Sequence, residues 1–201
     1  YGSSVSSGGA VYVAHYREFA INQQYLASYK RTFADLHNFD VLAGYESYNL
    51  KLQELQGSNT KIYNPTIGEL NNAIASPPRV ASFTNEYTTM GYLARIQYDY
   101  DEKYFVSASY RRDASSRFHP DNRWGNFGSV GLAWLINKEN FMSNVSWIDM
   151  LKFKASYGIQ GNDNLGNYYA YADQYSVTNS NGDFAVSFSY KGNKDITWET
   201  S

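Results

Sequence analysis

The chain has 201 residues, of which 43% are hydrophobic and 18% are charged, and these proportions are those of a folded chain. Its net charge of -2 provides no basic surface for nucleic acid, and the absence of cysteine excludes a disulfide scaffold and a zinc site with cysteine ligands. A helical membrane protein is also excluded, because no apolar run approaches the ~20 residues that a spanning helix needs.

The first quarter of the chain predicts strands. Residues 10–20, 22–33 and 37–50 alternate between apolar and polar side chains, which is the pattern of a β-strand with two unlike faces. We expect each strand to pair with its neighbour through a short connection. From 51 to 86 the alternation fails, with a segment at 51–56 that suggests a helix and Asn and Pro pairs that suggest turns. A long loop is therefore expected there, as on the extracellular side of a barrel.

A long alternating strand is expected next, at 88–100. Tyr92 and Ile96 lie on its apolar face, and Arg95 lies on its polar face. Only two residues separate this strand from the next one, which begins near Lys103. So short a connection predicts a tight hairpin.

The remainder of the chain predicts further strands. A polar loop is expected at 111–124, and the strands are expected at 129–136, 149–160, 168–177 and 183–190. We expect eight or nine strands in all, joined alternately by short and long connections. This order predicts an antiparallel meander.

Strand length and aromatic content favour a membrane barrel. Strands of about a dozen residues exceed the five or six that are typical of soluble sheets, and they match the length of a tilted membrane strand. The 20 Tyr, 11 Phe and 4 Trp suit the border between lipid and water, although carbohydrate-binding sheets are also rich in tyrosine. A mean hydropathy of -0.54 is compatible with a barrel, because only every second residue of a strand faces lipid. The sequence predicts an all-β chain that forms part of a transmembrane β-barrel.

Four segments resemble a known family. They are KYFVSASYRRDASSRFHPDNRWGNFGSVGLAW, NKENFM, WIDMLKFKASYGIQGNDNLGNY and ITWET, which follow one another between residues 103 and 200. In order and spacing they resemble the C-terminal half of the SusC/RagA family of TonB-dependent outer-membrane transporters. The matching positions include Arg112, Asp113, Ser115, Ser116, Arg117, Phe118, Arg123, Trp124, Ser156, Tyr157, Gly158, Gly161, Asn162, Trp198 and Glu199, whereas Ala114 replaces the usual Gly. Residues 1–86 are similar to the family only in their general sequence character.

This resemblance implies a piece of a large barrel of the 22-stranded type in the bacterial cell outer membrane. It implies a plug in the lumen, contact with TonB through an N-terminal region missing from this segment, and a SusD-like surface lipoprotein as a lid. The implied substrates are large nutrients, either glycans or peptides, and the strands would contact outer-membrane lipid. Residues 1–201 are thus expected to be part of a receptor barrel domain, cut from a longer protein.

Candidate ligand-binding residues are polar or aromatic side chains expected on the inner face or in loops. The inward Arg95, Lys152 and Lys154 are expected to form a polar packing surface for the plug, with direct substrate contact as the alternative. The cluster of Arg111, Arg112, Asp113 and Arg117 is expected to hold a loop in shape through hydrogen bonds to Asp113, with anion binding as the alternative. Trp124, like Tyr168, Tyr169 and Tyr171, has packing as its preferred role and stacking on sugars as the alternative.

The sequence predicts no catalytic site, no cofactor and no metal site. His15, His37 and His119 lie far apart in the chain, and no phosphate-binding loop or nucleophile motif occurs. Two alternatives to an energised importer remain open. One is a secreted soluble β-sandwich that binds carbohydrate, and the other is a passive outer-membrane barrel or adhesin.

Overall fold

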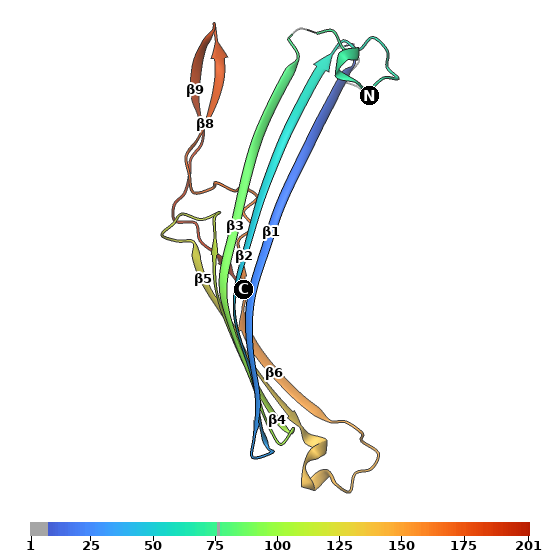
Figure 1. Cartoon of the computed structure of the whole chain (residues 1–201), viewed down its shortest axis with the longest axis vertical. Helices are drawn as coiled ribbons and strands as arrows, with labels where there is room; N and C mark the ends of the chain where they lie inside the picture. Colours follow the sequence, from blue (N-terminus) through green and yellow to red (C-terminus); the bar gives the residue numbers. More distant parts are fainter. Residues whose placement is uncertain (1–7, 76) are drawn as a thin grey trace. The chain divides into compact units, whose positions relative to one another are not determined.

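The computed structural model describes residues 8–75 and 77–201 and shows an antiparallel sheet of six strands (Figure 1). Each strand of this sheet neighbours the next one in the sequence, so the predicted meander is confirmed. The six strands are β1 (Ala10–Phe33), β2 (His37–Thr60), β3 (Arg79–Tyr100), β4 (Tyr104–Ser115), β5 (Trp124–Leu135) and β6 (Lys152–Ile159).

Four shorter strands form two separate ladders. They are β7 (Gly161–Asn162) with β10 (Glu199–Thr200), and β8 (Gln174–Ser180) with β9 (Asp183–Tyr190). Three short 3₁₀-helices complete the structure, namely η1 (Leu70–Asn72), η2 (Ile136–Lys138) and η3 (Asn140–Met142). Within the described residues, no helix has the length and apolarity to cross a membrane.

The first three strands are longer than the sequence predicts. The two strands expected at 10–20 and 22–33 are one continuous strand, and the segment at 51–56 belongs to β2 and is not helical. The expected long loop from 51 to 86 shrinks to 61–78. Polar side chains pair across these strands, as where the Tyr12 hydroxyl donates to Gln56 Oε1 at 2.8 Å. The alternation fails there because polar side chains occupy both faces, which pattern reading mistakes for a loop.

The chain divides into two compact units, and β1, β2 and β3 run through both. The first unit contains Asn49–Glu86 and β1 as far as Ile21. Its connection from 61 to 78 folds back on itself, with a single β-bridge between Ile62 and Ala73. The Asn72 side-chain amide donates to the backbone oxygen of Asn64 at 2.6 Å, which fixes this turn. The predicted Asn and Pro turns therefore lie in the part of the loop that remains.

The second unit, Asn22–Tyr48 with Tyr87–Ser201, contains β4 to β10. Two tight turns close its first two hairpins. Asp101 and Glu102 have φ values of 51° and 49°, and the Lys103 N–H donates to the Tyr100 oxygen at 3.0 Å. Positive φ at both central residues is the geometry of a type I′ turn, which matches the twist of the flanking strands. The hairpin predicted at this position is confirmed.

Candidate functional site

Cross-strand register assigns the paired residues of β3 to β6 to one of two faces. Ile96 pairs with Ala108, Ala108 with Val130, and Val130 with Tyr157. Side chains of directly paired residues lie on the same face, so these four form one row. The next row has opposite character and consists of Gln97, Ser107, Gly131 and Ser156.

One face is apolar and exposed, and we call it the outer face. Each of the large side chains named next has between about two fifths and three quarters of its surface accessible. Its residues include Tyr92, Ile96, Tyr100, Tyr104, Val106, Tyr110, Val130, Leu132, Phe153, Tyr157 and Ile159. A contiguous apolar surface of this extent marks contact with lipid or with another protein. Tyr92 and Ile96, which the sequence places on the apolar face of their strand, both lie on this face.

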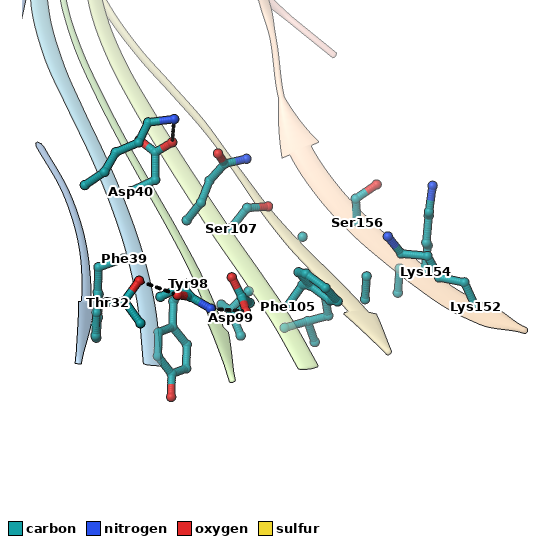
Figure 2. A pocket seen from close by; sticks show the side chains of 18 of the residues that line it. Thr32, Phe39, Asp40, Tyr98, Asp99, Phe105, Ser107, Lys152, Lys154 and Ser156 are labelled. Carbon is teal, nitrogen blue, oxygen red and sulfur yellow. Dashed lines mark hydrogen bonds and ion pairs between the residues drawn. The ribbon is translucent and has the colours of Figure 1, made fainter. Parts of the chain in front are cut away.

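The opposite, inner face is polar and contains a groove of about 680 Å³ that crosses from β1 to β6. Figure 2 shows Asp40 and Asp99 on one side of this groove and Lys152 and Lys154 on β6 at the other. The carboxylates are already paired. Lys30 Nζ lies 2.8 Å from Asp40 Oδ2, and Asn38 Nδ2 donates to Asp99 Oδ1 at 2.8 Å.

Among residues 8–75 and 77–201, the cations of β6 have no carboxylate partner. Lys152 Nζ lies 4.9 Å from the centre of the Phe105 ring, and Lys154 makes no ion pair or hydrogen bond within the described part of the chain. This side of the groove is therefore positively charged. It can accept carboxylates from a segment or ligand that is not part of this sheet.

A second polar cluster on the inner face surrounds Arg111. Its guanidinium donates to Glu46 Oε2 at 2.8 Å and makes two bonds of 3.2 Å to the carboxylate of Asp113. Gly91 pairs with Asp113, and a Cβ at Gly91 would collide with that carboxylate. A glycine is thus needed where the carboxylate crosses the neighbouring strand. Asp113 is thus an acceptor for Arg111, but it lies within β4 and not in the loop that the sequence predicts.

A third cluster joins β3, the end of β4 and the segment after β7. The Tyr87 and Ser115 hydroxyls both donate to Asp163 Oδ2, at 2.6 and 2.7 Å. Arg117 Nη1 donates to the Asp163 backbone oxygen at 3.0 Å, and its guanidinium lies 4.5 Å from the centre of the Tyr87 ring. Tyr168 lies on the same guanidinium at 5.3 Å. These contacts hold the long connection after β7 against the sheet.

Aromatic packing supports that cluster. Phe118 is completely buried, and the centre of its ring lies 5.5 Å from that of Trp198. Phe127 packs on the other side of Trp198 at 5.1 Å, and the Trp198 indole N–H donates to the Arg123 oxygen at 2.9 Å. Ser115, Arg117, Phe118 and Trp198, which are among the residues that carry the family resemblance, therefore help to position this connection.

The structure separates the predicted site residues into groups. Arg95, Lys152 and Lys154 lie on the inner face, and Arg111 and Asp113 lie there together. Arg112 points to the outer face and covers Trp124 at 5.0 Å, so the expected four-residue cluster does not form. Trp124 begins β5 and stacks on Tyr92, so it is not a loop residue. Arg117 belongs to the Asp163 cluster.

Sequence reading missed Glu46, Tyr87 and Asp163 as members of these clusters. Glu46 lies 65 residues from Arg111, and Tyr87 lies 76 residues from Asp163. No local sequence signal joins residues so far apart. Within the described residues no group of three His, Asp or Glu side chains is placed to bind a metal ion.

A meandering antiparallel sheet with an apolar outer face, a polar inner face and tight turns is part of the wall of a transmembrane β-barrel. No protein-family model matches the chain. It is 35% identical over 183 residues to TonB-dependent receptor P39 of Formosa agariphila, covering 86% of this chain and 17% of that protein. It is 30% identical over 173 residues to TonB-dependent receptor SusC of Bacteroides thetaiotaomicron, covering 81% of this chain and 17% of SusC.

Solved structures give the same result. The RagAB peptide transporter superimposes with a TM-score of 0.84 at 25% identity, over 94% of this chain and 21% of the matched chain. The RagAB peptide importer in its open-open state superimposes with a TM-score of 0.79 at 26% identity, with the same coverage. This chain belongs to the SusC/RagA family of TonB-dependent receptors. It spans about a fifth of the length of the relatives that it matches.

Proposed function

We propose that this chain forms part of the wall of a TonB-energised importer of large nutrients in the outer membrane of a bacterium. The observation that carries this proposal is the separation of an apolar outer face from a polar inner face across adjacent strands. Such a wall divides lipid from a wet or protein-filled lumen. The relatives support the same reading, because they are named as receptors and transporters and not as enzymes.

The inner face would serve as a packing surface for a plug. The groove of about 680 Å³ and the unpaired Lys154 support this role, because a plug carboxylate would neutralise the positive side of the groove. Arg95 and Lys152 would contribute to the same surface. The Arg111 and Arg117 clusters would maintain the shape of the wall and its loops, since both guanidiniums are already bound by acceptors of the chain itself.

We further propose that the full-length protein acts with a SusD-like lipoprotein lid and takes up glycans or peptides. The RagAB peptide importer, a relative with the same fold, supports peptides as one of these substrate classes. The lid would cover the extracellular ends of the strands, and TonB would contact the N-terminal region of the full-length receptor. Substrate choice would depend mainly on loops, plug and lid.

The test is growth of the native bacterium after deletion of the full-length gene. The deletion strain should lose growth on a subset of oligosaccharides or peptides supplied as the sole carbon source, and the wild-type gene should restore it. Deletion of TonB should abolish the same uptake. Uptake that persists without TonB would favour a passive barrel. Recovery of the full-length protein from the soluble fraction without detergent would contradict the proposal and favour a secreted carbohydrate-binding module.

A further inference from the structure

The connection between β5 and β6 differs from the other two turns at the same end of the sheet. The first two hairpins close through tight turns, at Ala34 and Asp35 and at Asp101 and Glu102. The third connection spans residues 136–151 and contains η2 and η3. Its two ends are tied together, because the Leu151 N–H donates to the Asn137 side chain at 3.2 Å and the Ile136 N–H donates to the Leu151 oxygen at 2.8 Å.

Hydrogen bonds attach this connection to the outer face. The Glu139 carboxylate accepts the Tyr104 hydroxyl and, at 3.0 Å, the indole N–H of Trp134. Tyr104 and Trp134 pair directly across β4 and β5 in the same row as Phe153, which belongs to the outer face. The connection is therefore fastened on the apolar side of the wall and not on the groove side.

The connection exposes large apolar side chains. The accessible fractions are 66% for Phe141, 82% for Trp147 and 72% for Met150. A turn that only reverses the chain direction in water does not require three large apolar side chains on its surface. Trp and Phe side chains are typical of segments that lie at the boundary between the lipid headgroups and the acyl chains.

Aromatic packing at the adjacent edge of the sheet also indicates a position at the boundary between headgroups and acyl chains. Tyr100 stacks on Tyr104 at 6.4 Å between ring centres, and Tyr104 stacks on Trp134 at 6.4 Å. These rings form a row along the edge of the outer face, as girdle residues do at a membrane surface. The nearby lysines are already paired, with Lys138 Nζ 2.6 Å from Glu102 and Lys103 Nζ 2.7 Å from Asp101. The attraction of the connection to the membrane surface would therefore come from apolar contacts and not from charges.

We propose that residues 136–151 form an interfacial anchor, in which Phe141, Trp147 and Met150 insert into the headgroup boundary of the membrane at the tight-turn end of the sheet. The occupant of this exposed apolar surface is lipid, because the surface continues the lipid-facing side of the wall through Glu139, Tyr104 and Trp134. The anchor fixes the depth and tilt of this part of the wall. This inference rests on the proposed membrane location of the full-length receptor.

The experiment places a nitroxide at the anchor of the full-length receptor in phosphatidylcholine vesicles. This chain has no cysteine, so Trp147→Cys introduces the labelling site once any cysteine elsewhere in the full-length protein has been replaced. Collision rates with oxygen, which is concentrated in lipid, and with a water-soluble nickel complex give the depth of the label. Met150→Cys is a second anchor position. Ile96→Cys on the outer face is the lipid control, and Asp121→Cys in the loop after β4 is the aqueous control.

We expect the label at 147 to collide more with oxygen than with nickel and to lie roughly 0–10 Å below the phosphates. The same depth is expected when anionic lipid is added to the vesicles, because the nearby lysines are already paired. A label at 147 that matches the aqueous control, or one shielded from both reagents by a protein surface, would overturn the anchor. A label at 96 that also collides mainly with nickel would instead contradict the membrane location, so the two failures are distinguishable.

Discussion

The division between the two faces predicts opposite responses to the same substitution at adjacent residues. Ile96→Lys would place a charge on the outer face, whereas Gln97→Lys would place it in the groove of the inner face. Ile96 has 44% of its surface exposed and shares its row with Ala108 and Val130, so little protein shields a lysine at this position from lipid. The two substitutions place a lysine on the same strand at nearly the same depth in the membrane, but on opposite faces of the sheet.

The magnitude follows from the position of Ile96. Four residues separate it from Tyr100 in the aromatic row, which is about 13 Å along a strand and about 10 Å along the membrane normal at a tilt of about 40°. Half of an apolar band of about 25 Å is about 12 Å, so Ile96 lies near the midplane. A lysine there should lower the free energy of unfolding by about 2–4 kcal/mol, while Gln97→Lys should change it by no more than about 0.5 kcal/mol.

The assay is guanidinium unfolding of the full-length receptor in lipid vesicles, followed by tryptophan fluorescence, with both variants and the wild type measured in parallel. In a thicker bilayer, the ammonium group of a lysine at position 96 lies further from water. The cost of Ile96→Lys should therefore not fall when lipid with longer acyl chains is used. Equal losses for the two variants, or a larger loss for Gln97→Lys, would refute the assignment of the faces and with it the wall.

Three further outcomes follow from the clusters and loops, each measured on the full-length receptor. Asp163→Ala removes the acceptor of two hydroxyls and should lower the free energy of unfolding by about 2 kcal/mol. The control Asp121→Ala, at a side chain that is 84% exposed, should change this free energy by less than about 0.5 kcal/mol. Equal effects of the two substitutions would contradict the Asp163 cluster. Phe118→Ala empties a fully buried site and should cost about 3–5 kcal/mol in the same titration, and a loss below about 1 kcal/mol would show that the ring is not packed as described. The Gly192 N–H and the Lys191 ammonium hold the pKa of Asp173 below its ordinary value, so the contact of Asp173 with Gly192 is fully present above that ordinary value and is lost as the pH falls through the lowered one. Amide exchange of residues 174–190, corrected for its intrinsic rate, should therefore differ between the wild type and Asp173→Asn at neutral pH and converge in strong acid; a constant difference would remove the carboxylate from the explanation.

Much of the second unit could be predicted from the sequence. Alternation assigned Tyr92 and Ile96 to the apolar face and Arg95, Lys152 and Lys154 to the inner face, because successive side chains of a strand point to opposite faces. The same interpretation failed at 51–56, where Leu52 and Leu55 fall on opposite faces of β2 and polar residues occupy the other positions, so the apolar residues do not alternate.

The candidate site was less predictable. Arg111 and Arg112 are adjacent in the sequence and were treated as one cluster, but a strand directs neighbouring side chains to opposite faces, so Arg112 covers Trp124 on the outer face. The loop expected at 111–124 begins only after Ser115, because β4 continues to that residue, and it ends before Trp124, where β5 begins.

The sequence by itself determined the all-β class, the two unlike faces, the tight turn at Asp101 and Glu102 and the family, because each depends on a local pattern or on motifs within one segment. Only the tertiary structure decided that Glu46 reaches Arg111, that Tyr87 and Ser115 share Asp163, and that the connection 136–151 is fastened to the outer face. These contacts depend on which strands are neighbours and on their register, and a one-residue shift of register would reverse every face. Long-range pairing of this kind leaves no periodic trace in the chain.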